Sequence, residues 1–282
     1  MIRPSFTALI SLIVLLFGTT VSALAGEGGG AHKLPLYAEP LFGAFTNSTV
    51  MTWLAVAVIV IFCRIATKKM ALVPAGLQNF AEWVVESLYD FLGGMLGDKL
   101  VARTFWFFGT IFFFILVNNY MALVPGVGTV TYNGTYLMRG GNADLNMTAA
   151  MALTFAILWF YWAITETSFK DFFAHIFAPK GKFQGIMLAL MVPVFLFVGF
   201  LEVISIGIRP VALSFRLFGN IYGGEQTLES LMHLTSIKAL HWLPALPFYF
   251  MELLVGFVQA LVFTLLCAVF LKLICDHGDE HH

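Results

Sequence analysis

Five long apolar stretches constrain the fold of this chain more than any other feature of its sequence. A bilayer core is about 30 Å thick, so a helix of about 20 apolar residues crosses it. Only 11% of the 282 residues are charged, whereas a soluble domain carries about 25%. The stretches cover about residues 50–65, 104–124, 147–164, 184–231 and 243–274. We therefore predict an all-α integral membrane protein with about five membrane helices, and the composition excludes a soluble enzyme.

The N-terminus has the pattern of a secretory signal peptide. Arg3 gives a positive start, residues 8–17 form a short apolar run, and the Ala-Leu-Ala tripeptide at 23–25 offers a cleavage site. We predict a signal peptide at residues 1–25 and a single membrane domain at residues 26–282. The alternative is an uncleaved first membrane helix. In both cases the segment that follows lies on the outer side of the membrane.

Basic residues predict how the chain is oriented in the membrane. The first stretch ends in Arg64, Lys68 and Lys69, and the third leads to Lys170, Lys180 and Lys182. The positive-inside rule places both groups in the cytoplasm. Five crossings then leave the N-terminus outside and the C-terminus in the cytoplasm. Arg139 is the only basic residue of the loop between the second and third stretches, which suits an external loop.

Residues 70–100 differ from the five stretches because polar side chains interrupt their apolar residues. The apolar residues at helical spacing are Leu77, Phe80, Trp83, Val84, Leu88 and Phe91, and Gln78, Glu82, Glu86 and Asp90 lie between them. This pattern predicts an amphipathic helix at the cytoplasmic interface.

The last two apolar stretches contain ionisable residues, which are costly at membrane depth and point to function. They include Glu202, Arg209, Arg216, Glu225 and Glu252. Glu202, Arg209 and Arg216 are seven residues apart and share one face of a helix. Glu202 could simply pair with Arg209, or Arg209 could extend its guanidinium toward the interface.

Arg216 is the hardest of these residues to explain as a structural one. It lies between apolar neighbours, and arginine does not lose its proton in proteins. A carboxylate supplied by another chain is the natural partner. Asn220, four residues on, shares the Arg216 face. Glu225 lies nine residues on, about 13.5 Å along the axis and on roughly the opposite face, where it could also be an interfacial carboxylate.

Glu252 and Gln259 are seven residues apart in the last stretch and share one face. The bland interpretation of Gln259 is an interhelical hydrogen bond, the usual role of such a residue in a membrane helix. Small residues at Gly219, Gly223, Gly224 and Gly256 permit close helix approach.

Residues 216–225 read Arg-Leu-Phe-Gly-Asn-Ile-Tyr-Gly-Gly-Glu. This run resembles the signature of subunit a of F-type ATP synthases, in which LFGN follows an arginine and a glutamate comes nine residues after that arginine. Segments 119–125, 209–211 and 246–263 resemble the family as well, and the resemblance covers roughly residues 40–275. This chain has Ala122 where some members have an acidic residue.

The resemblance implies roles for the charged and polar residues. In the family the arginine faces a rotating ring of c-subunits, so Arg216 is implied to be the stator arginine. Glu225 and Glu252 map onto the outward half-channel, although many members have histidine at the second position. The resemblance also places Gln259 and Asn220 on the ion path near the arginine, and Glu202 and Arg209 match family positions. It further implies that the last two helices are long and strongly tilted along the ring.

The resemblance implies a non-catalytic subunit that carries protons, or sodium ions, and is coupled to ATP synthesis. Its implied partners are the c-ring, the b-subunit peripheral stalk, the rest of the ATP synthase and the lipid of a bacterial inner membrane. The chain has no phosphate-binding loop, so we expect that it does not bind ATP. We expect no cofactor or metal, because no CxxC pair is present and no two histidines have helical ligand spacing within one element apart from the polar tail. The near-neutral net charge of −1 gives no indication of nucleic acid.

Two other classes of protein are alternatives. A secondary transporter with an intramembrane ion pair would show repeated halves and helices broken at matching positions, and the sequence shows no such repeat. An inert assembly or anchor protein would leave Arg216, Glu225 and Glu252 unexplained.

The predicted signal peptide is testable by intact-mass measurement of the purified chain. Cleavage after Ala25 gives a mature chain that starts at Gly26. A mass that retains residues 1–25 would contradict cleavage and indicate an additional membrane segment.

Overall fold

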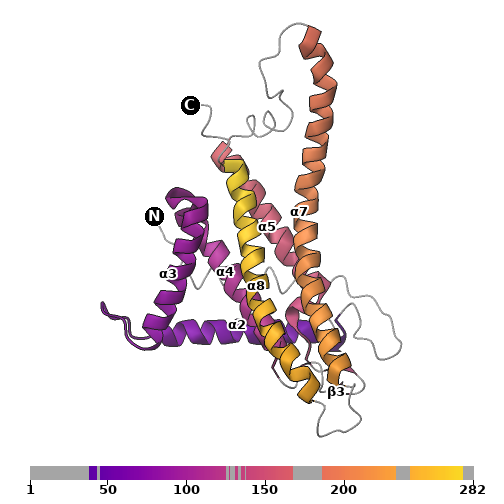
Figure 1. Cartoon of the computed structure of the whole chain (residues 1–282). Coiled ribbons are helices and arrows are strands. Elements are labelled where there is room, and N and C mark those ends of the chain that lie inside the picture. Colours follow the sequence, from indigo (N-terminus) through magenta and orange to yellow (C-terminus); the bar gives the residue numbers. More distant parts are fainter. Residues whose placement is uncertain are drawn as a thin grey trace.

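A computed structural model describes most of the chain as one bundle of long helices (Figure 1). The described residues are 38–42, 45–124, 127, 131–132, 135–136, 138–167, 186–232 and 242–275. The predicted signal peptide lies outside these ranges, as does the predicted cytoplasmic turn with Lys170, Lys180 and Lys182.

Five helices of the described part are long and apolar enough to cross a membrane, as predicted. They are α2 (Asn47–Ala66), α4 (Asp98–Ala122), α5 (Leu145–Thr167), α7 (Ile186–Met232) and α8 (Trp242–Cys275). The largest boundary difference is at the start of α4, which we expected near residue 104. The first turns of α4 contain the charged residues Asp98, Lys99 and Arg103. The helix therefore begins before its apolar stretch does.

The predicted amphipathic helix is α3 (Leu77–Leu96), between Gly76 and Gly97, which both have positive φ. Its buried stripe is Leu88, Leu92 and Leu96, and it packs chiefly against α4. Figure 1 shows α3 running beside the longer helices, whereas α2 runs across them.

The helix α7 is much longer than a bilayer core is thick. Its 47 residues span about 70 Å at 1.5 Å per residue, more than twice the thickness of a bilayer core, about 30 Å. The 20 residues of α2 match that thickness. Because α2 crosses the direction of α7 and α8 in Figure 1, these three helices cannot all stand upright in one membrane.

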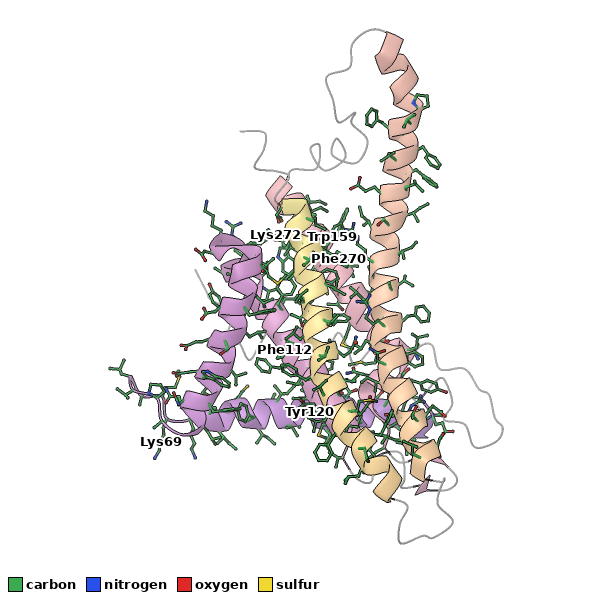
Figure 2. All side chains as sticks on the ribbon, in the orientation of Figure 1. Lys69, Phe112, Tyr120, Trp159, Phe270 and Lys272 are labelled. Carbon is green, nitrogen blue, oxygen red and sulfur yellow. The ribbon has the colours of Figure 1, made fainter. Side chains whose placement is uncertain are left out.

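The core of the bundle is aromatic and lies between α4, α5 and α8. Phe107 stacks on Phe155 at 6.3 Å between ring centroids, and Trp159 donates from Nε1 to the Phe270 carbonyl at 3.0 Å. Figure 2 shows Trp159, Phe270, Phe112 and Tyr120 following one another along α8. The bundle is therefore held together by large apolar contacts, as expected inside lipid.

A polar segment before α5 folds inward and joins four helices. It contains the short helix η2 (Gly141–Ala143), which packs against α2, α4, α5 and α7. Two small hairpins flank this region, β1 (Pro40–Phe42) with β2 (Phe45–Thr46) and β3 (Thr131–Tyr132) with β4 (Thr135–Tyr136).

Asp144 ties this segment to the start of α2. Its Oδ2 accepts from Ser48 Oγ at 2.8 Å, and its Oδ1 accepts from the backbone N–H of Asn146 at 3.0 Å. Ser48 and Asp144 are both fully buried. The N-terminal end of α2 is therefore fixed to residues almost one hundred positions later in the chain.

Ser48→Ala is expected to destabilise the chain, because it leaves the buried Oδ2 of Asp144 without the Ser48 hydroxyl. The expected loss is about 1–3 kcal/mol of unfolding free energy, measured by SDS titration of the purified chain with tryptophan fluorescence. Ser87→Ala is the matched control, since Ser87 is exposed and bonds only to its own helix. Equal stability of the two variants would contradict the proposed tie.

Candidate functional site

The seven residues singled out by the sequence lie on two adjacent helices. Glu202, Arg209, Arg216, Asn220 and Glu225 belong to α7, and Glu252 and Gln259 belong to α8. The two helices pack against each other and run side by side in Figure 1. Glu252 and Gln259 are buried, Arg216 and Asn220 are exposed, and the other three residues are half-buried.

Glu225 and Glu252 meet in one small cavity between α4, α7 and α8. We call it the carboxylate pocket, and it is lined by Asn119, Ala122, Leu123, Ile221, Glu225, Leu228, Glu252 and Gly256. Its volume is about 10 Å³, which corresponds to one water molecule. Glu252 is only 5% exposed, and Glu225 is half-buried. The two carboxyl groups are thus close together with little room for solvent.

Two glycines allow the backbone to approach these carboxyl groups closely. A Cβ atom at Gly224 would overlap the carboxyl group of Glu252. A Cβ atom at Gly140 would overlap the carboxyl oxygen Oε1 of Glu225 and lie 2.8 Å from the Cβ of Ala122. Glycine is therefore required at both positions for the pocket to have this shape.

Two asparagines extend the pocket toward the polar segment, and the sequence reasoning gave neither a role. Asn119 donates from Nδ2 to the Gly256 carbonyl at 2.9 Å, and its Oδ1 accepts from Asn142 Nδ2 at 2.7 Å. Both side chains are buried. The two adjacent asparagines at 118 and 119, inside an apolar stretch, are the sequence feature that could have predicted these contacts.

Gln259 makes an interhelical hydrogen bond, the alternative that the sequence left open for it. Its Oε1 accepts from Asn220 Nδ2 at 2.6 Å, which joins α7 to α8 one turn beyond Arg216. Gln259 is only 4% exposed, and it shares the buried face of Glu252, as the seven-residue spacing predicted.

Arg216 is exposed on α7, beside the residues that pack into the bundle. Its neighbours Leu213 and Leu217 are buried in the bundle, whereas Arg216 itself is exposed. It lines a second, open cavity of about 390 Å³ together with Arg209, Ser205 and apolar residues of α7 and α8. The predicted common face of Arg209 and Arg216 is thus confirmed.

Arg209 is fixed against α8 by an aromatic ring. Its Cζ lies 4.8 Å from the centroid of Phe270, a distance at which a cation is attracted to the ring face. Glu202 is half-buried farther back on α7, and the open cavity is lined by its neighbour Leu201 and not by Glu202 itself.

Arg139 is a buried cation that the sequence reasoning did not place in the site. It is 2% exposed, its Nη2 donates to the Ala143 carbonyl at 2.9 Å, and its Cζ lies 5.8 Å from the centroid of Tyr222. Its only signal in the sequence was its position as the single basic residue in a long external loop.

The chemistry of the two regions differs. Two carboxyl groups that line a cavity the size of one water molecule cannot easily both be charged. Such a pair can therefore share or pass on a proton or a small cation. An exposed, permanently charged guanidinium on an apolar helix can attract an anionic group of another molecule. Within the described residues, no cluster of histidine, cysteine and acidic side chains could hold a metal ion.

Comparisons with known proteins agree with this architecture. The family model described as ATP synthase A chain matches residues 49–272. ATP synthase subunit a of Solidesulfovibrio magneticus is 33% identical over 256 residues, which cover 90% of this chain and 94% of the relative. Subunit a of Desulforamulus reducens is 30% identical over 243 residues, covering 84% and 82%.

Some relatives are longer. The match to ATP synthase subunit a of Anaeromyxobacter dehalogenans is 32% identical over 244 residues, covering 84% of this chain but 59% of that relative. The family match extends over nearly the whole bundle, from the first turn of α2 to the last turn of α8. The chain therefore belongs to the ATP synthase subunit a family, whose members are non-catalytic membrane subunits of the ATP synthase complex.

Proposed function

We propose that this chain is the stator subunit that carries protons, or sodium ions, past a rotating c-ring, with Arg216 as the stator cation. The observation that carries the proposal is the combination of a permanent charge with an uncovered apolar helix. Only 6% of an 18-residue apolar window of α7 is buried inside the chain, against 44% for the corresponding window of α4. Arg216 is exposed on that helix, so a surface supplied by another membrane protein suits it better than lipid does.

The charge of Arg216 explains how a rotor could be discharged. A rotor carboxyl group must be neutral while it faces lipid. Beside Arg216 the anion is favoured, so the group releases its ion there. The fixed positive charge also opposes direct passage of cations between the two sides of the membrane.

The carboxylate pocket is proposed as part of the outward half-channel. Glu225 lies about 13.5 Å along α7 from Arg216, and the Asn220–Gln259 hydrogen bond lies between the two positions. Ions would thus pass from the outer side through Glu225 and Glu252 toward the rotor. The open cavity beside Arg216, which Arg209 also lines, is proposed for the inward half-channel, with Glu202 farther along the same helix.

Ion flow along this route supplies energy to a motor. Each elementary charge that crosses the membrane contributes about 2.3 kcal/mol per 100 mV. Several such steps would be collected by rotation for each ATP formed in the catalytic part of the complex.

The orientation and partners are proposed on the same basis. Arg64, Lys68 and Lys69 lie at the end of α2, so the positive-inside rule places that end in the cytoplasm. The N-terminus then lies outside a bacterial inner membrane, after removal of a signal peptide at residues 1–25, and the C-terminus lies in the cytoplasm. The c-ring and the b-subunit stalk are the proposed partners.

Arg216→Lys is expected to reduce coupled ATP synthesis to background in inverted vesicles while the complex still assembles. Lysine keeps the charge but lacks the planar fork and the very high proton affinity of arginine. Arg216→Ala should also abolish synthesis and in addition increase passive proton flux, because the barrier charge is lost. Arg64→Lys is the matched control and should behave as wild type, since Arg64 is exposed at the end of α2. Robust synthesis by Arg216→Lys would refute the proposed role.

Glu225→Gln and Glu252→Gln are each expected to slow ion-driven synthesis by about tenfold or more, because an amide keeps the volume but cannot carry the ion. The double variant should be slower than either single one. Glu86→Gln on the exposed face of α3 controls for loss of an acidic group elsewhere. Wild-type rates in both single variants would remove the carboxylate pocket from the ion path.

A further inference from the structure

We propose that Thr148 and Ser214 are positioning residues, which fix the rotation of α7 and thereby the direction in which Arg216 extends. The inference rests on the proposed function, because it takes Arg216 as the stator cation. The two hydroxyl groups do not touch the ion or the rotor. They act only through the orientation of the helix that carries Arg216.

The hydroxyl groups of Thr148 and Ser214 form a buried hydrogen bond between α5 and α7. Their oxygen atoms are 3.1 Å apart, and the two residues are 0% and 4% exposed. Thr148 Oγ1 also donates to the Leu145 carbonyl at 3.1 Å. Because a hydroxyl group has only one proton to donate, Ser214 is the donor to Thr148. The bond therefore has a defined direction, from α7 toward α5.

Ser214 uses its proton differently from other hydroxyl residues in the long helices. A serine or threonine inside a helix can donate to the carbonyl four residues earlier. Thr154 on α5 and Ser230 farther along α7 both make such a bond, which places no restriction on how their helix turns against its neighbours. The Ser214 proton instead reaches a second helix, so this side chain restricts the rotation of α7.

Thr148 is a firm anchor because the start of α5 is itself held in place. The backbone N–H of Thr148 donates to the Asp144 carbonyl at 3.2 Å. The carboxylate of Asp144 accepts from Ser48 on α2 and from the backbone N–H of Asn146. A chain of polar contacts therefore runs from α2 through the start of α5 to α7.

The part of α7 that carries Arg216 follows a weak point in the helix. Pro210 lies inside α7, and proline lacks the N–H that would bond to the carbonyl four residues earlier. The preceding half of the helix therefore controls the orientation of Arg216 less rigidly. Ser214 comes four residues after Pro210 and two before Arg216. Its bond thus acts between the weak point and the charge.

The bond at Ser214 is well placed to set the direction of Arg216. Two residues turn a helix by about 200° and advance it by about 3 Å, so the two side chains leave α7 in nearly opposite directions. A rotation that moves Ser214 away from Thr148 turns Arg216 by the same angle. One turn beyond Arg216, Asn220 donates to Gln259 of α8 at 2.6 Å. Arg216 is therefore held between two directed contacts, one to α5 and one to α8.

Thr148→Val tests the proposal in the whole ATP synthase, because valine keeps the branched shape and removes the hydroxyl group. Coupled ATP synthesis in inverted vesicles, divided by the amount of assembled complex, is expected to fall about threefold, which is the usual effect of one interhelical hydrogen bond in a membrane. Passive proton flux through vesicles stripped of the catalytic part should rise by a similar factor, because a misdirected Arg216 is a poorer barrier. Ser214→Ala should show both changes.

Three further variants control the experiment. Thr148→Ser keeps the hydroxyl group and should retain wild-type synthesis and flux. Thr154→Val removes a hydroxyl group that bonds within α5 and should also behave as wild type. The double variant of Thr148→Val and Ser214→Ala should be no worse than either single variant, because both changes remove the same bond, whereas independent defects would add.

A smaller amount of complex with normal synthesis and flux per complex would overturn the inference, because a merely structural role predicts that result. Failure of both Thr148→Val and Ser214→Ala to assemble would overturn it for the same reason, as would reduced synthesis without added flux. Arg216→Lys is measured in parallel. Robust synthesis by Arg216→Lys would refute the proposed function. An inactive Arg216→Lys together with a normal Thr148→Val would refute only the positioning role.

Discussion

A charged or ionisable side chain is stable inside a bilayer only where protein groups or water replace the bulk solvent, and the arrangement of this chain depends on that constraint. Glu225 and Glu252 share a cavity of about 10 Å³, and glycines at positions 140 and 224 bring the backbone against their carboxyl groups. The inward-folded segment before α5 brings polar groups to the end of the bundle near the start of α2, where Asn142 donates to Asn119. Arg216 is different, because it is exposed on an apolar helix, and we propose that a second molecule compensates its charge.

The asymmetry of α7 follows from this difference. Leu213, Leu217, Ile221 and Leu228 form a buried stripe against the bundle, and the opposite side of the helix is uncovered. The helix continues without a break past every charged residue that it carries. A secondary transporter would instead be expected to interrupt its helices around such a site. One long helix with a packed side and an open side suits a surface past which a partner moves.

Much of the fold could be predicted from the sequence, because apolar length and helical spacing are local properties. The five spans, the amphipathic α3 and the shared faces of Glu252 with Gln259 and of Arg209 with Arg216 all follow from them. The contacts between elements could not be predicted in the same way. No local sequence pattern indicates that Arg139 is buried with its guanidinium over the ring of Tyr222. Its position depends on how an irregular segment folds against helices far away in sequence. The cation–π contact between Arg209 and Phe270 likewise depends on the register between α7 and α8, which spacing within one helix does not determine.

The tie between Ser48 and Asp144 also bears on biosynthesis. The two residues are separated by 96 positions, so the translocon must release α2, α3 and α4 before the bond can form. The carboxylate pocket needs α7 and α8 as well, which emerge last from the ribosome. A half-made chain can therefore contain the Ser48–Asp144 hydrogen bond without the Glu225–Glu252 pair, and the carboxylate pocket is complete only when synthesis is almost finished.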